Sequence, residues 1–204
     1  MTSDNLLVEL RVEELPPKAL LRLGQAFAKS VHQGLVQQHL VDPLPSQSQA
    51  LAFQAFSTPR RLAVWVRGVQ SHANDQQVVQ KLMPKSVGLD ARGQPTQALQ
   101  KKLQALGWVE NEWPDALAKM QTQSDGKNEV LTLITQVKGV TLAQGLQSVL
   151  DKALADLPIP KVMQYPLHQH CDQPGWRTVS FVRPAHGLVV LHGDQVVDVM
   201  CLGW

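Results

Sequence analysis

The sequence has only two cysteines in 204 residues, Cys171 and Cys201, and they lack CxxC spacing. Two cysteines are too few for a disulfide framework, so we expect two free thiols. A short polar run contains His168, His170 and Cys171, whose side chains are zinc ligands in other proteins. No second ligand pair stands at finger-like spacing, and we therefore predict a polar loop with no metal site.

The sequence also lacks a long apolar run and a basic, apolar leader. No run approaches the roughly 20 apolar residues that a membrane-spanning helix needs. The opening MTSDNLLVELRVEEL has no basic region before its first acidic residues, so it does not resemble a secretory signal peptide. With 44% hydrophobic and 18% charged residues, the composition is typical of a globular protein. We expect a cytoplasmic chain with no membrane partner.

The usual catalytic motifs are missing as well. The sequence contains no GxGxxG, no GxxxxGK[ST], no GxSxG and no HExxH. Glu13 and Glu14 are adjacent, so in a strand their carboxylates would point to opposite faces, which does not suit a glycosidase pair. Their better explanation is charge complementarity with the positive end of the helix that follows. We predict no catalytic residue, because the sequence offers no nucleophile–base pair for hydrolysis or another independent activity.

Two stretches have the spacing of long amphipathic helices. The first begins at Pro16 and Pro17, which suit a helix start, and continues to about residue 40. The second begins after Thr141, which is a favourable N-cap, and runs through Leu154.

Most other predicted elements are strands joined by short turns. They cover residues 6–10, 50–56, 61–69, 116–121, 130–139, 178–184, 188–192 and 196–200. A short helix is predicted over 96–106, and residues 70–95 are polar without a clear pattern. Hairpins with intervening helices are typical of an α+β fold with a mainly antiparallel sheet. We expect a core of residues 1–70 with 129–204, interrupted by a smaller middle segment of residues 71–128.

Four blocks of the sequence resemble one family. LLVELRVEELPPKAL resembles the opening of the beta subunit of bacterial glycyl-tRNA synthetases, and STPRRLAV (57–64) matches an arginine-pair strand entry of that family. LPIPKVM (157–163) and FVRPAHGLVVLHGDQVV (181–197) match two further signatures in the family order. The sequence departs from the family pattern at Arg11 and at Gln164-Tyr165. Because later family blocks are missing and the end is apolar, residues 1–204 are expected to be the N-terminal region of a longer subunit.

The resemblance implies a role in attaching glycine to tRNA(Gly) with ATP and magnesium. In this alpha2beta2 enzyme the alpha subunit carries the aminoacylation site and binds ATP, so no cofactor is expected in this chain. The expected partners are the alpha subunit, tRNA(Gly) and the rest of the beta subunit. The chain alone is expected to be inactive and to supply surfaces that handle tRNA and dock subunits.

The basic residues of these blocks are the candidate tRNA contacts, since arginine and lysine neutralise phosphates. They are Arg60, Arg61, Lys161, Arg183 and His186. The alternative is a structural scaffold without tRNA contact, in which the three arginines pair with Glu13 or Glu14. Burial distinguishes the two hypotheses, because sequestered arginines cannot reach RNA and surface arginines along one groove can.

Overall fold

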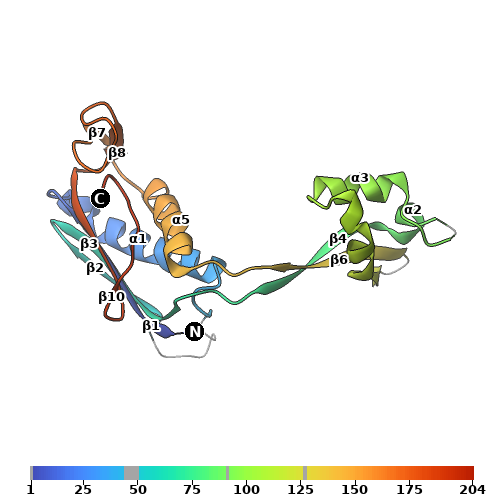
Figure 1. Cartoon of the computed structure of the whole chain (residues 1–204). Helices are drawn as coiled ribbons and strands as arrows, with labels where there is room; N and C mark the ends of the chain where they lie inside the picture. Colours follow the sequence, from blue (N-terminus) through green and yellow to red (C-terminus); the bar gives the residue numbers. More distant parts are fainter. Residues whose placement is uncertain (1, 44–50, 91, 126–127) are drawn as a thin grey trace. The chain divides into compact units, whose positions relative to one another are not determined.

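The computed structural model describes residues 2–43, 51–90, 92–125 and 128–204 (Figure 1). The chain forms two compact units. Unit 1 comprises Met1–Asn74 and Gly139–Trp204, and unit 2 comprises Asp75–Lys138. Antiparallel strands and interspersed helices confirm the predicted α+β fold. Within the described ranges, no helix has both the length and the apolar character that a bilayer crossing requires.

Unit 1 is built on a five-stranded antiparallel sheet with the strand order β10-β9-β1-β3-β2. Its strands are β1 (Ser3–Val12), β2 (Phe53–Thr58), β3 (Arg61–Gln70), β9 (Ala185–His192) and β10 (Gln195–Val196). The central strand β1 pairs with β3 on one side and with β9 on the other. Segments from the two ends of the sequence therefore meet along β1.

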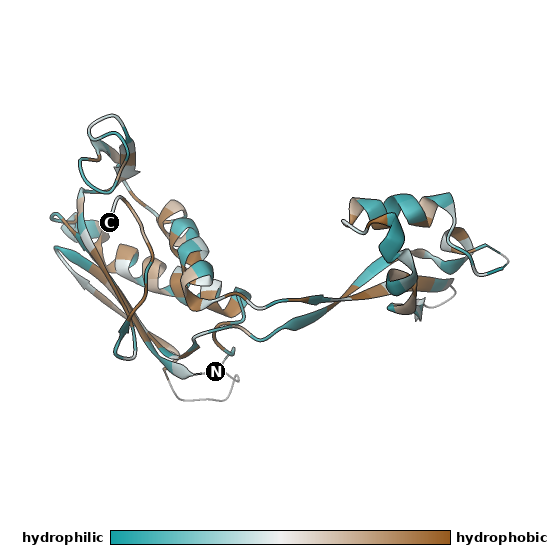
Figure 2. Ribbon diagram, in the orientation of Figure 1, coloured by the Kyte–Doolittle hydropathy of each residue, from teal (hydrophilic) through white to brown (hydrophobic). Residues whose placement is uncertain are grey.

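Two helices pack their apolar sides into the core of unit 1. They are α1 (Pro17–Gln37) and α5 (Leu142–Ala155). Leu23, Phe27 and Val31 are buried on α1 at helical spacing, and alternate residues of β1 are buried with them. Figure 2 shows hydrophobic and hydrophilic residues interspersed along both helices. Thr141 caps α5, because its hydroxyl accepts a hydrogen bond from the Gln144 N–H at 3.3 Å, as predicted.

A two-stranded ribbon completes unit 1. It consists of β7 (Met163–Pro166) and β8 (Thr178–Phe181), joined by residues 167–177. This connection contains the polar run with Cys171, which is a free cysteine, as is the buried Cys201. In the described part of the chain, no cluster of three or more histidine, cysteine or acidic side chains has the arrangement of a metal site.

Unit 2 has a three-stranded sheet with the order β4-β6-β5. Its elements are β4 (Gln76–Pro84), α2 (Lys85–Gly88), α3 (Gln97–Ala105), the 3-10 helix η1 (Glu110–Glu112), α4 (Trp113–Ala118), β5 (Met120–Asp125) and β6 (Asn128–Val137). Leu99 and Leu103 of α3 pack against Leu131 and Leu133 of β6 in a core separate from that of unit 1.

Two predicted strands have other bounds, and one segment without a prediction contains regular structure. Residues 70–95, which have no apolar pattern, contain β4 and α2. Most side chains of β4 are exposed, and the strand is held by its ladder with β6. The strand predicted over 116–121 begins at Met120, since Ala116 and Ala118 belong to α4. Of the strand predicted over 196–200, only Val196 belongs to a strand, and the Val197 N–H also donates to the Val190 carbonyl at 3.0 Å. The connection between the strands predicted over 116–121 and 130–139 includes residues 126–127, which lie outside the described residues.

His32 is a half-buried titratable group in the core of unit 1. Its ring lies on α1 and stacks on Phe53 of β2, with the ring centroids 4.7 Å apart. Its Nε2 atom is buried and has no hydrogen-bond partner among the described residues. Burial lowers the pKa of His32 below its ordinary value.

We expect the free energy of unfolding to fall as the pH drops below about 6.5, the ordinary histidine pKa in an unfolded chain. The reason is that the unfolded state binds a proton on His32 more readily than the folded state. His32→Phe keeps an aromatic ring against Phe53 without a titratable group, so its stability should fall less over the same range. Urea unfolding of both proteins above and below this pH measures the difference, and identical losses would contradict the role of His32.

Candidate functional site

Three segments that are far apart in the sequence meet at one end of the five-stranded sheet. They are the chain that leaves β1, the β2–β3 turn and the link into β9. Because β1 lies between β3 and β9, its continuation is held between the other two segments. The backbone hydrogen bonds that join them run from Val12 N to Arg60 O (3.0 Å), from Leu15 N to Pro59 O (2.7 Å) and from Glu13 N to Pro184 O (2.9 Å).

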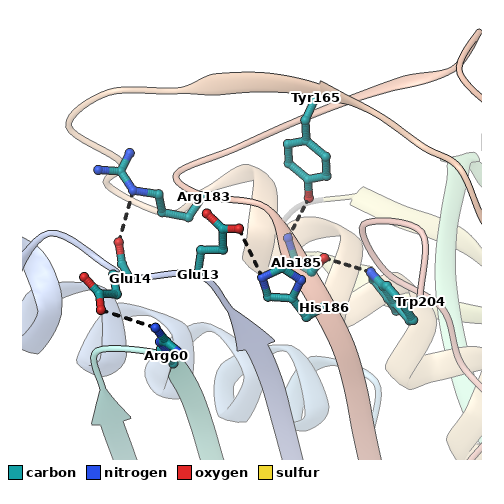
Figure 3. Close-up of polar contacts among 8 residues, drawn as sticks. All are labelled: Glu13, Glu14, Arg60, Tyr165, Arg183, Ala185, His186 and Trp204. Atoms are coloured by element: carbon teal, nitrogen blue, oxygen red, sulfur yellow. Dashed lines mark hydrogen bonds and ion pairs between the residues drawn. The ribbon is translucent and has the colours of Figure 1, made fainter.

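The two glutamates lie between β1 and α1. Helix α1 begins only at Pro17, and its first turn contains no acidic residue. Glu13 and Glu14 therefore precede the helix, and their charge complementarity with its positive end stays a prediction. The carboxylates face basic side chains from the other two segments, as Figure 3 shows. Leu15, which is buried, anchors the segment to the core.

These segments line an open groove of about 750 Å³. Its charged side chains come from all three of them, and prolines form much of its remaining surface. The lining residues are Val12, Glu13, Glu14, Leu15, Pro16, Pro17, Pro59, Arg60, Arg183 and His186. The groove thus combines two carboxylates with two guanidinium groups and one imidazole.

Two exposed side-chain contacts join the segments that line the groove. Arg60 Nη2 lies 3.4 Å from Glu14 Oε1, and these side chains are 73% and 74% exposed. His186 Nε2 lies 3.6 Å from Glu13 Oε1, with both side chains about half exposed. Ion pairs at such exposure stabilise a fold by at most about 1 kcal/mol. The pair with Glu14 therefore leaves Arg60 able to turn toward another anion.

Arg183 is held more firmly than Arg60. Its Nε atom donates a hydrogen bond to the backbone carbonyl of Glu14 at 3.0 Å. Its Nη1 atom donates to the Val182 carbonyl at 3.2 Å and lies 3.0 Å from the sulfur of Met163. The guanidinium group is thus fixed at the groove wall, and it joins the segment after β1 to the link before β9.

Two of the five predicted residues lie outside the groove. Arg61 is the first residue of β3, and its Nη1 atom lies 3.3 Å from Glu9 Oε1 on the neighbouring strand β1. The scaffold hypothesis expected Arg61 to pair with Glu13 or Glu14, and Arg61 pairs with neither of them. Lys161 is exposed in the segment before β7. The structure therefore brings together Arg60, Arg183 and His186 and leaves Arg61 and Lys161 apart.

Two aromatic residues that sequence reasoning missed support the start of β9 behind the groove. The Ala185 N–H donates to the hydroxyl oxygen of Tyr165 at 3.1 Å, and Trp204 Nε1 donates to the Ala185 carbonyl at 2.9 Å (Figure 3). Burial raises the pKa of Tyr165, so its phenol stays protonated at neutral pH. Tyr165 stands where the sequence departs from the family pattern, and Trp204 belongs to no predicted element, so neither gave a signal.

The groove offers charged groups that can bind an anion. Its described lining contains no serine, threonine, cysteine or lysine that would act as a nucleophile beside a base. A guanidinium group binds phosphate and carboxylate groups well, because its N–H donors match their oxygens. The facing carboxylates of Glu13 and Glu14 limit the net positive charge of the groove.

Comparison with known proteins gives a consistent result. The model of the glycyl-tRNA synthetase beta subunit family matches residues 6–204. The glycine–tRNA ligase beta subunit of Methylobacillus flagellatus is 54% identical over 202 residues, which are 98% of this chain and 27% of that protein. Those of Polaromonas naphthalenivorans and Paracidovorax citrulli are 51% and 52% identical over 100% of this chain, and the matches cover 28% and 27% of their lengths.

The chain thus spans about a quarter of the length of these relatives. The family match runs through all four blocks on which the resemblance rests, including the three segments that form the groove. The chain belongs to the glycyl-tRNA synthetase beta subunit family.

Proposed function

We propose that this chain works within a glycine–tRNA ligase, where it contacts tRNA(Gly) and helps to dock the subunits. In this proposal the alpha subunit binds ATP with magnesium and carries the aminoacylation site. The chain described here contributes no catalytic residue and acts together with the rest of the beta subunit in the cytoplasm. The family membership supports a part for the chain in a glycine–tRNA ligase.

The observation that carries the proposal is the convergence of Arg60 and Arg183 on one open groove. Arg60 is exposed, and its ion pair with Glu14 is weak enough for a phosphate to replace it. Arg183 is oriented in advance by the Glu14 carbonyl, which reduces the entropy lost when it binds an anion. The two guanidinium groups therefore contact neighbouring phosphates of one tRNA strand.

A scaffold without tRNA contact is the second candidate. It is favoured by Glu14, whose side chain pairs with Arg60 while its carbonyl accepts from Arg183. On this hypothesis the contacts serve to join the three segments, and the groove receives protein from the rest of the beta subunit or from the alpha subunit.

Steady-state kinetics of the alpha–beta holoenzyme separate the two candidates. With Arg60→Ala and Arg183→Ala together, we expect the KM for tRNA(Gly) to rise about tenfold or more, because two charge-assisted contacts are lost. Glycine-dependent pyrophosphate exchange, which reports activation without tRNA, should stay unchanged.

Arg177→Ala is the matched control, because Arg177 is 65% exposed and also pairs with a carboxylate, that of Asp172 at 3.6 Å. Arg177 lies outside the groove lining, so its replacement should leave the KM for tRNA(Gly) and the rate of pyrophosphate exchange unchanged. An unchanged KM in the double variant, or an equal loss of pyrophosphate exchange, would favour the scaffold. Thermal unfolding of the double variant shows whether the lost contacts of Arg183 affect the fold.

A further inference from the structure

Unit 2 contains a separate open pocket of about 520 Å³. Its apolar surface comes from Trp108, Ala118 and Ile134, and its polar surface includes three glutamine side chains, Gln77, Gln121 and Gln136. Lys119 is the charged residue among the described residues that line it. In contrast to the groove of unit 1, no described carboxylate faces this pocket.

The ends of two helices position the pocket. Gly107 has a φ of +87°, which glycine adopts without strain, and this turn closes α3 and leads to Trp108. The Trp108 N–H donates to the Leu103 carbonyl at 3.1 Å, which fixes the start of the next segment. Lys119 follows α4, and its carbonyl accepts from the Ile134 N–H at 3.3 Å. Both side chains are thus placed by backbone contacts of regular elements.

The edge of β6 supplies the remaining side of the pocket. The ladder between β5 and β6 ends where Met120 pairs with Leu133. Strand β6 continues beyond this pair, and its residues 134–136 line the pocket. The pocket therefore lies beside the part of β6 that extends past the end of β5 and still pairs with β4.

The side chains that line this pocket are of the kinds that bind a nucleobase. Trp108 is half-buried and packs against the core of unit 2, and Lys119 Nζ lies 5.4 Å from its ring centroid. A large indole held in this way offers a stacking surface for a base. Each glutamine amide is both a donor and an acceptor, as the edges of bases require. None of the three amides has a hydrogen-bond partner in the described part of the chain.

We propose that this pocket binds an unpaired base of an RNA. The base stacks against Trp108, its edge contacts the glutamine amides, and Lys119 turns from the indole to the adjoining phosphate. This proposal rests on the proposed function, in which the chain meets tRNA(Gly). The absence of carboxylates from the described lining favours a ligand that carries a phosphate. An apolar peptide side chain would leave the three glutamine amides without hydrogen-bond partners. An acidic peptide with an aromatic residue is the competing ligand.

Fluorescence titration of the 204-residue chain with model RNA hairpins tests the proposal. One hairpin carries an unpaired 3′ extension that contains 2-aminopurine, the second carries abasic sites in the same extension, and the third is blunt. We expect the extended hairpin to bind about tenfold more tightly than the other two, with quenching of 2-aminopurine on stacking. Trp108→Ala should abolish both the preference and the quenching, and Trp108→Phe should keep most of the preference.

Trp176→Ala is the control, because Trp176 lies in unit 1 and is 84% exposed. Lys119→Ala, which leaves the indole in place, should weaken binding of the extended hairpin and make it less dependent on salt. Equal binding of the three hairpins, or quenching that persists in Trp108→Ala, would overturn the proposal. Binding of an acidic aromatic peptide that depends on Trp108, without any hairpin preference, would assign the pocket to protein instead.

The same titrations keep this inference separate from the proposed function. Arg60→Ala with Arg183→Ala should weaken all three hairpins alike, because these residues contact phosphates in the groove of unit 1. If the groove proposal fails, that variant binds like the parent while the preference for the extended hairpin remains. If the pocket proposal fails, the preference is absent while the arginine variant still loses affinity.

Discussion

Gly139→Ala is expected to destabilise unit 1 by about 3 kcal/mol or more, at the upper end of single-residue effects. A Cβ atom at Gly139 would overlap the backbone carbonyl of Ala73. Neither group can rotate away, since the Ala73 N–H donates to the Val140 carbonyl at 2.9 Å and Thr141 bridges to His72. Relief of the overlap therefore requires that the two backbone segments separate at the point where the chain re-enters unit 1.

Gly187→Ala is a suitable comparison within the same unit. A Cβ atom there would lie 3.8 Å from the nearest atom, Arg11 Cδ, which is ordinary van der Waals contact. We expect its effect to stay within about 1 kcal/mol. Urea unfolding followed by circular dichroism measures both variants. Similar unfolding midpoints for Gly139→Ala and Gly187→Ala would show that the two segments do not approach as described.

Reversal of charge in the groove should have the largest functional effect. Arg60→Glu with Arg183→Glu is expected to lower the affinity of the holoenzyme for tRNA(Gly) about a hundredfold. The reason is that two contacts with phosphates become repulsions beside the existing carboxylates of Glu13 and Glu14. Filter binding or anisotropy at low salt measures the change, because salt screens exposed charges.

The control for charge reversal is Arg177→Glu, which places a new carboxylate beside Asp172 outside the groove. It adds negative charge to the same unit, so it accounts for general repulsion of the RNA. We expect it to change the affinity several times less than the double variant does. Equal losses would mean that net charge, and not the position of Arg60 and Arg183, governs binding.

The elements with a strong apolar period were predictable from the sequence. Helices α1 and α5 bury residues at helical spacing, and Thr141 forms the capping box that its hydroxyl suggests. Strand β4 could not be found in this way, because its side chains are largely exposed and its position depends on the hydrogen bonds of β6. Periodicity reports burial, and a strand that buries little gives no signal.

The groove could be predicted only in part. The four blocks that resemble the family contain Arg60, Arg61 and Arg183, but the sequence does not specify which of these side chains converge. Glu14 is 46 residues from Arg60 and 169 residues from Arg183, and the three meet because β1 pairs between β3 and β9. Arg60 and Arg61 are neighbours in the sequence, yet one belongs to a turn and the other begins a strand. Only the strand pairing separates their environments.

The salt dependence of tRNA(Gly) binding tests the central claim most directly. The affinity of the alpha–beta holoenzyme is measured over a range of salt concentrations for the parent and for Arg60→Ala with Arg183→Ala. If each arginine contacts one phosphate, the plot of log affinity against log salt should become shallower by about 1.4 to 1.8 in the double variant. Parallel plots of equal affinity would contradict the account and leave the groove as a structural junction.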